Sequence, residues 1–86
     1  KEIGKIRTPA VLYKGQAIKI SVDVKNRGWL KANLIGESNE LLATEQINKT
    51  STDTILFEQR SIPSKRVQIE FELNDAKLYS FVFASQ

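Results

Sequence analysis

The sequence predicts an all-β domain, and three observations lead to that prediction. Residues 18–24 and residues 67–73 alternate apolar and polar side chains with a period of two, as half-buried strands do. Gly, Pro, Asn and Asp recur between such segments, about every ten residues. No segment has helical periodicity over a useful length. Together these features predict a small antiparallel β-sandwich of about six to eight strands, jelly-roll-like in form.

The size and composition of the chain predict a single domain, residues 1–86, that depends on its apolar core. Eighty-six residues are too few to build two cores. The sequence has no cysteine and no histidine, so neither a disulfide nor a common zinc site can stabilise it. No segment approaches the roughly 18 consecutive apolar residues of a transmembrane helix. Burial of Val, Ile, Leu and Phe must therefore stabilise the fold, and we expect no membrane span.

The first half of the chain predicts an edge strand followed by a hairpin. Residues 3–7 alternate and stop at Thr8-Pro9, and proline, which lacks an N–H group, belongs at a strand end or a sheet edge. Residues 18–24 form the clearest strand, and residues 29–35 are expected to return beside it. Asn26-Arg27-Gly28 lies between these strands and has the composition of a short hairpin loop.

The middle of the chain is less regular. Residues 41–47 fit neither period cleanly and are compatible with a strand or a single helical turn. Residues 48–53 are polar and predict a loop, whereas residues 54–59 are strand-like. Pro63 interrupts residues 61–65, which predict another loop.

The C-terminal region predicts a second, closing hairpin. Residues 67–73 form its first strand, and Asn74-Asp75-Ala76-Lys77 is expected to form the turn. Tyr79, Phe81 and Phe83 recur at every second position of the following strand. We expect all three rings to face inward, because alternate residues of a strand lie on the same face.

The net charge of +3 is unevenly distributed. Residues 1–31 hold eight Lys or Arg and two acids, a net of +6, and the remainder holds five bases and eight acids, a net of −3. Nucleic-acid binding is one interpretation of the basic part. However, most of these bases lie two positions apart on predicted strands, as on the solvated face of a sheet. No aromatic residues interleave with them as stacking platforms. We therefore predict no nucleic-acid partner.

The composition also argues against catalysis. Without His or Cys, the common nucleophile–base pairs are missing. The four glycines never cluster, so no phosphate-binding loop is expected. Glu70 and Glu72 share one strand face, but a charged outer face opposite Ile69 and Phe71 explains them. We predict that the chain is not an enzyme and has no cofactor and no metal site.

The strand at residues 29–35 provides the candidate ligand-binding residues. If Leu30 and Ala32 face the core, then Trp29, Lys31 and Asn33 face outward. An exposed indole flanked by an amine and an amide could stack on a sugar ring and bond its hydroxyl groups. In the alternative interpretation, Trp29 caps one end of the sandwich or lies beneath a neighbouring domain.

Motifs spread over residues 4–83 support a resemblance to a known family. They are Gly4-Lys5-Ile6-Arg7-Thr8, Gly15-Gln16-Ala17-Ile18 leading to Val22-Asp23, Gly28-Trp29-Leu30 leading to Leu34, and the ending Val67-Gln68-Ile69-Glu70-Phe71-Glu72-Leu73-Asn74-Asp75-Ala76-Lys77-Leu78-Tyr79-Ser80-Phe81. This pattern resembles the C-terminal β-sandwich accessory domain of bacterial five-bladed-propeller proteins of the glycoside hydrolase family 32/43 type. The segment Asp75-Ala76-Lys77-Leu78-Tyr79-Ser80-Phe81 is its most specific part. The middle, residues 36–53, is shorter than that family's pattern.

The resemblance implies a non-catalytic role, because the propeller that would carry the catalytic carboxylates is not in this chain. It implies an accessory module of a secreted or periplasmic bacterial carbohydrate-processing protein. Its partners would be a neighbouring glycosidase-like domain, which it packs against or orients, or a carbohydrate bound weakly. The alternative is a stand-alone secreted interaction module, monomeric or weakly dimeric, that associates through an edge strand or an exposed sheet face.

Overall fold

The computed structural model describes residues 3–58 and 66–84, and within these ranges the only regular elements are six β-strands. They are β1 (Gly4–Arg7), β2 (Val11–Leu12), β3 (Ala17–Ile35), β4 (Leu41–Ile47), β5 (Ser51–Leu56) and β6 (Arg66–Ala84). The all-β prediction is confirmed. The ambiguous segment at residues 41–47 is strand β4, and β5 begins inside the segment that was predicted as a loop. The loop predicted at residues 61–65 lies outside the described residues.

Two long strands, β3 and β6, form the centre of the sheet. Each has 19 residues, and they pair antiparallel from Ala17 opposite Ala84 to Ile35 opposite Gln68. The strands β1 and β2 pair with the outer edge of β6, and β4 and β5 pair with the outer edge of β3. All described strands therefore belong to one antiparallel sheet in the order β1-β6-β3-β4. The prediction of a sandwich of two separate sheets is not confirmed.

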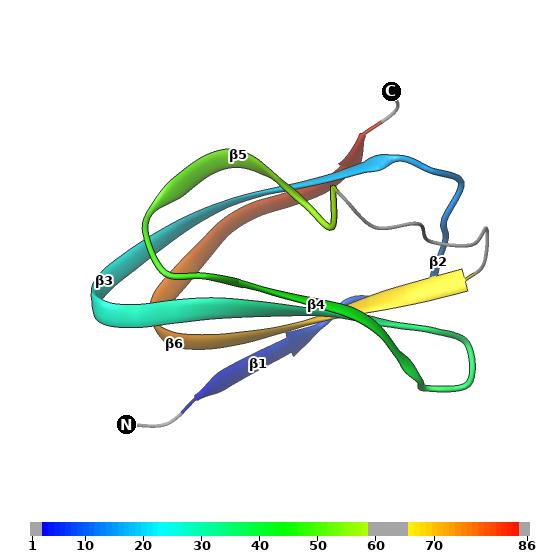
Figure 1. Ribbon diagram of the computed structural model, residues 1–86, viewed down its shortest axis with the longest axis horizontal. Coiled ribbons are helices and arrows are strands. Elements are labelled where there is room, and N and C mark those ends of the chain that lie inside the picture. The colour runs from blue at the N-terminus through cyan, green and yellow to red at the C-terminus, as the bar shows by residue number, and fades with distance from the viewer. Residues whose placement is uncertain (1–2, 59–65, 85–86) are drawn as a thin grey trace.

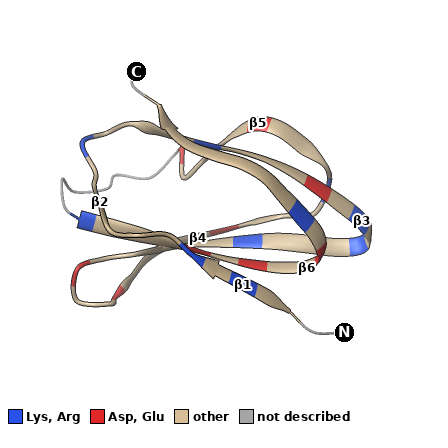
Figure 2. Ribbon diagram, turned by 180° about the vertical axis from the view of Figure 1, so that it is seen from behind, with Lys and Arg blue, Asp and Glu red and all other residues tan. Residues whose placement is uncertain are grey.

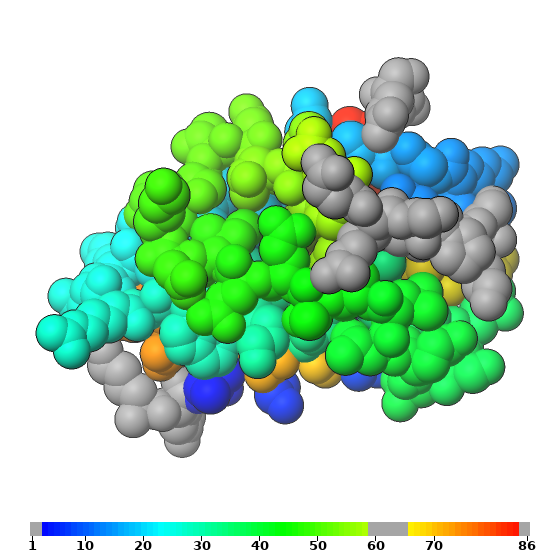
Figure 3. Space-filling view, in the orientation of Figure 1, coloured from blue at the N-terminus to red at the C-terminus, as the bar shows by residue number. Residues whose placement is uncertain are grey.

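The long strands bend together, so that the sheet folds over on itself (Figure 1). Asn26 of β3 and Asp75 of β6 have positive φ values of 52° and 51°, and the ladder is irregular between Val24 and Trp29. The lower half of the sheet holds residues 29–35 of β3 and 66–74 of β6, with β1, β2 and β4. The upper half holds residues 17–24 of β3 and 76–84 of β6, with β5. Figure 3 shows β4 and β5 in front of the rest of the molecule.

Both predicted hairpins are therefore wrong. The chain turns back at Asn26-Arg27-Gly28 and at residues 74–77 within a single bent strand, and the two arms of that strand do not pair with each other (Figure 1). Asn and Asp tolerate positive φ and serve equally in a turn or in a bend. The difference is set by the pairing partner: each half of β3 pairs with β6, not with the other half of β3.

The core lies between the two halves of the sheet. Its largest fully buried side chains are Ile18, Ile20, Val22, Leu30, Leu34, Val67, Ile69 and Phe71, each at most 1% exposed. Phe71 of the lower half and Phe81 of the upper half meet edge to face, with ring centroids 5.7 Å apart. Each such buried side chain contributes about 1.5–3 kcal/mol relative to its exposed state. The predicted inward orientation of Leu30, Ala32 and Leu34 is confirmed.

Gly28 permits the two bends to lie close together. A Cβ atom at this position would lie 2.3 Å from the carbonyl oxygen of Asn74 and 2.6 Å from that of Asp75. Both neighbours are backbone atoms, so neither can move without shifting β6. The bends are also joined by a hydrogen bond of 2.8 Å, which the Asn26 side-chain amide donates to the Asp75 carboxylate.

A β-bulge turns Tyr79 outward. Ser21 pairs with Ser80 and Val22 pairs with Leu78, which leaves Tyr79 as an extra residue on β6. An extra residue reverses the alternation along a strand. Leu78 and Phe81, on either side of the bulge, consequently both pack against the core, as does Phe83, whereas Tyr79 is 62% exposed. The predicted inward orientation holds for Phe81 and Phe83 and is wrong for Tyr79.

Candidate functional site

The outer surface of the lower half-sheet is a polar face that crosses four strands. Cross-strand neighbours share a face, and the register gives two polar rows: Gln46, Lys31, Glu72 and Lys5, and then Thr44, Asn33, Glu70 and Arg7. Basic and acidic positions lie side by side along β3, β6 and β1 (Figure 2). This arrangement follows from the alternation in the sequence, because the same strands turn Leu30, Ile69 and Phe71 inward.

Trp29 and Lys31 lie together at the end of this face. Both side chains are half-buried, and the Lys31 ammonium nitrogen lies 5.7 Å from the centroid of the Trp29 ring. This distance is within the range of a cation–π contact. Trp29 pairs with Asn74 beside the bend of β6. The structure therefore brings two of the three predicted ligand-binding residues into contact, and part of the indole surface remains accessible.

Asn33 lies apart from this pair, inside a hydrogen-bonded network. Its side chain is 8% exposed. The Thr44 hydroxyl donates to its amide oxygen at 2.8 Å, and its amide nitrogen donates to the Glu72 carboxylate at 2.7 Å. Both ends of the amide are thus engaged, and they link β4, β3 and β6. In this structure Asn33 joins strands and does not present its amide to a ligand.

The acids of the polar face are also engaged with neighbours. Arg7 forms an ion pair of 3.1 Å with Glu70 and a hydrogen bond of 3.3 Å with the Asn39 side chain. Such exposed pairs contribute about 0–1 kcal/mol. Because Glu70 binds Arg7 and Glu72 binds Asn33, the two glutamates act as cross-strand partners in a charged outer face.

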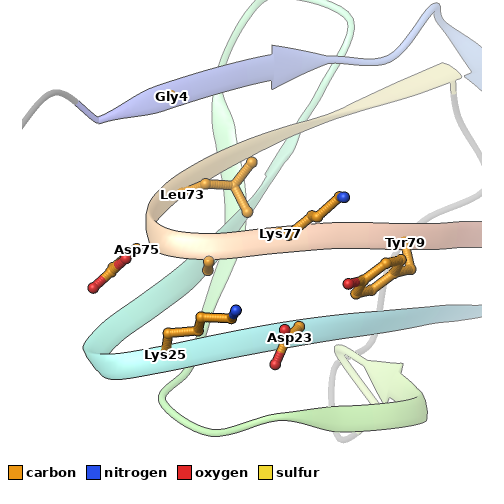
Figure 4. Close-up of a pocket in the computed structure, with 8 residues that line it drawn as sticks. Gly4, Asp23, Lys25, Leu73, Asp75, Lys77 and Tyr79 are labelled. Atoms are coloured by element: carbon orange, nitrogen blue, oxygen red, sulfur yellow. The ribbon is translucent and has the colours of Figure 1, made fainter.

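A second candidate site lies at the bend of β6, on the side that β1 borders (Figure 4). It is a depression of about 510 Å³ lined by Gly4, Asp23, Lys25, Leu73, Asp75, Ala76, Lys77 and Tyr79. The Lys77 ammonium nitrogen lies 5.2 Å from the centroid of the exposed Tyr79 ring. Strict alternation along the strand places Tyr79 in the core, so the sequence did not predict this site. No sequence signal reveals the bulge that turns the ring outward.

Large apolar side chains are also exposed at several places. In the described part of the chain, those that are more than two-fifths exposed are Ile3, Ile6, Leu12, Leu41, Tyr79 and Val82. The first three lie within the first twelve residues, on or next to β1 and β2. Those strands form one outer edge of the sheet.

Within residues 3–58 and 66–84, no group of three or more His, Cys, Asp or Glu side chains could hold a metal ion. No helix in the same ranges is long and apolar enough to cross a bilayer.

Comparison with known proteins adds no relative. No family model matches the sequence, and neither a curated protein nor a solved structure is similar to it.

Proposed function

We propose that this chain is a non-catalytic accessory module that packs against a neighbouring domain of a secreted or periplasmic bacterial carbohydrate-processing protein. The glycosidase-like parent follows from the resemblance in sequence, with the folded-over sheet taking the place of the β-sandwich. The packing role rests on one observation: the upper half of the sheet does not cover the inner side of β1. Ile6, on this strand, is 48% exposed although it belongs to the inner side of the sheet.

The register explains why Ile6 is uncovered. Ile6 pairs with Phe71, which is fully buried, so both side chains lie on the inner side of the lower half-sheet. Among the described strands, β6 is the edge strand of the upper half, so no strand of the upper half lies over β1. The inner side of β1 is therefore accessible to solvent. Ile3 and Leu12, at the same edge of the sheet, are also more than two-fifths exposed. Exposed apolar side chains at one edge favour an interaction surface there.

The reading frame on the N-terminal side of Lys1 tests this proposal first. A propeller-length domain there supports the accessory role, and a signal peptide alone would overturn it. In a two-domain protein, Ile6→Asp with Leu12→Asp should lower the Tm of the neighbouring domain. Leu41→Asp is the matched control, because Leu41 is 59% exposed on β4 and is not part of the β1–β2 edge. Equal effects of both variants would contradict packing through that edge.

Weak carbohydrate binding is a second candidate function, favoured by the accessible indole of Trp29 beside Lys31. A sugar ring stacked on this indole could accept a hydrogen bond from the Lys31 ammonium group. A glycan array with the wild-type module and with Trp29→Ala tests it. Binding that is lost in the variant supports the site. Absence of binding to any glycan, or binding that Trp29→Ala leaves unchanged, rejects it.

A further inference from the structure

One edge of the upper half of the sheet is unpaired in the part of the chain that the structure describes. From Ala76 to Ala84, β6 pairs with β3 on one edge, and no described strand pairs with its other edge. In the lower half, β1 occupies the corresponding edge of β6, at residues 70–73. We call the space beside residues 76–84 of β6 and above the inner side of β1 the notch.

Three observations indicate that the notch is open among the described residues. The depression of about 510 Å³ begins at Gly4 of β1 and Leu73 of β6 and extends past Ala76 of β6 to Asp23 and Lys25 of β3. A Cβ atom added at Gly4 would meet nothing within 4 Å. Ile6, on the same side of β1, is half exposed. Figure 4 shows β6 and β3 side by side beyond the bend and β1 apart from them.

We propose that the notch binds one extended segment of the neighbouring domain, which adds a strand to β6 and covers Ile6. An unpaired strand edge is a template for such strand addition, in which backbone hydrogen bonds provide affinity and side-chain pockets provide specificity. The added strand becomes the fourth of the upper half and matches the lower half in width. This inference rests on the proposed accessory role and names how the neighbour docks.

The shape of the notch favours a single segment over a second copy of the module. Each copy has a lower half-sheet that extends past its upper half by the strands β1 and β2. Joining two copies through their β6 edges would bring both overhanging edges into the same space. A single strand has no such lower layer, so it fits between β6 and the inner side of β1.

The charges around the notch indicate the chemistry of the segment. Residues 76–84 of β6 carry one base, Lys77, and no acid. The two acids that line the depression already accept hydrogen bonds: Asp23 from Thr50 and Asp75 from Asn26. Lys25 forms no ion pair with any residue in the described ranges. The segment should therefore be apolar at alternate positions, toward Ile6 and Leu73, and should carry an acid beside Lys77.

A synthetic nine-residue peptide, with alternating Val and Thr and one Glu near the end that would lie beside Lys77, tests the notch without the neighbouring domain. Added at about 1 mM to the ¹⁵N-labelled module, it should shift the amide signals of residues 76–84 and slow their hydrogen exchange. The same peptide with alternate amides N-methylated cannot donate backbone hydrogen bonds and should not bind. Absence of shifts, or equal shifts with the methylated peptide, would overturn the proposal.

Two variants locate the binding. Ile6→Glu should weaken peptide binding at least tenfold, because it places a charge under the added strand. Leu41→Glu, on a residue of β4 that is exposed to 59%, should leave binding unchanged. Sedimentation decides between the occupants. If the measured mass rises with protein concentration and the peptide returns it to the mass of the monomer, a second copy uses the notch. That result would refute the single-segment proposal.

The outcomes separate this inference from the accessory role. Peptide binding with no propeller in the reading frame would retain the notch as a strand-binding site and reject the glycosidase-like neighbour. A stabilised neighbouring domain without peptide binding would retain the accessory role and reject strand addition.

Discussion

The two halves of β6 both carry large apolar residues at alternate positions, but their surroundings differ. In the lower half, Val67, Ile69 and Phe71 occupy alternate positions and are each at most 1% exposed. In the upper half, Tyr79, Phe81 and Phe83 also occupy alternate positions. However, the Tyr79 ring is 62% exposed, and the two phenylalanines are only partly buried.

The difference follows from the number of neighbouring strands. The lower half is paired at both edges, with β3 on one side and with β1 and β2 on the other. The upper half is paired with β3 alone among the described strands. A strand held at both edges has a fixed register, whereas a free edge accommodates a bulge. Alternation therefore predicts burial reliably in a central strand and less reliably at an edge.

The largest effect is expected when one phenylalanine in each half is replaced. Phe71→Ala removes a fully buried ring and should reduce the free energy of unfolding by about 3–5 kcal/mol. Phe83→Ala removes a ring that is only partly buried and should cost about 1–2 kcal/mol. Urea denaturation of both variants measures the difference. Equal losses would show that the two halves are equally well packed.

The next test concerns the bend that separates the halves. Gly28→Ala should reduce the free energy of unfolding by about 2–3 kcal/mol, because the new methyl group meets the backbone of Asn74 and Asp75. Gly4→Ala is the control, since open space surrounds that position. The Tm of each variant, measured by circular dichroism, gives the comparison. If Gly28→Ala is as stable as Gly4→Ala, the backbone of Asn74 and Asp75 does not lie close to Gly28.

A smaller effect is expected on the polar face of the lower half. Asn33→Ala leaves the Thr44 hydroxyl and the Glu72 carboxylate without a partner that they now bind, and should cost about 1–2 kcal/mol. Lys31→Ala, at the adjacent outward position of β3, should cost less than about 0.5 kcal/mol. Chemical denaturation distinguishes the two. If Asn33→Ala leaves the free energy of unfolding unchanged, these hydrogen bonds do not hold the Asn33 amide in place. Asn33 would then be available to bind a ligand.

The smallest effect is expected at the bulge. Tyr79→Ser should change the free energy of unfolding by no more than about 0.5 kcal/mol, because most of the ring is in solvent. An inward-facing tyrosine, which strict alternation predicts, would lose several times as much on truncation. Thermal unfolding of this single variant therefore decides between the bulged and the regular strand.

Local patterns in the sequence predicted the strands but not how they are connected in space. The period-two alternation at residues 18–24 and 67–73 correctly predicted two strands and their buried faces. Asn26-Arg27-Gly28 did not reveal whether the strands on either side of it pair with each other or with a third strand. That choice depends on a partner strand about 50 residues away, which no local pattern contains.

The candidate site was predictable only in part, for the same reason. Alternation placed Trp29 and Lys31 on the outer face and in reach of each other. It could not show that Thr44 and Glu72, from two other strands, bind the Asn33 amide. The depression beside Tyr79 depends on the bulge in β6 and on the distance to β1. Neither is encoded in the spacing of residue types.

The long central ladder also has a kinetic consequence. Ala17 pairs with Ala84, 67 positions later in the chain, whereas Leu34 of β3 pairs with Ala43 of β4, only nine positions away. Because closing a long loop costs entropy before contacts form, we expect β3 and β4 to associate first and β6 to join last, in milliseconds to seconds. Pulse-labelled hydrogen exchange would show this order as earlier protection of the β4 amides. The strand with the open edge would then also be the last to gain protection during folding.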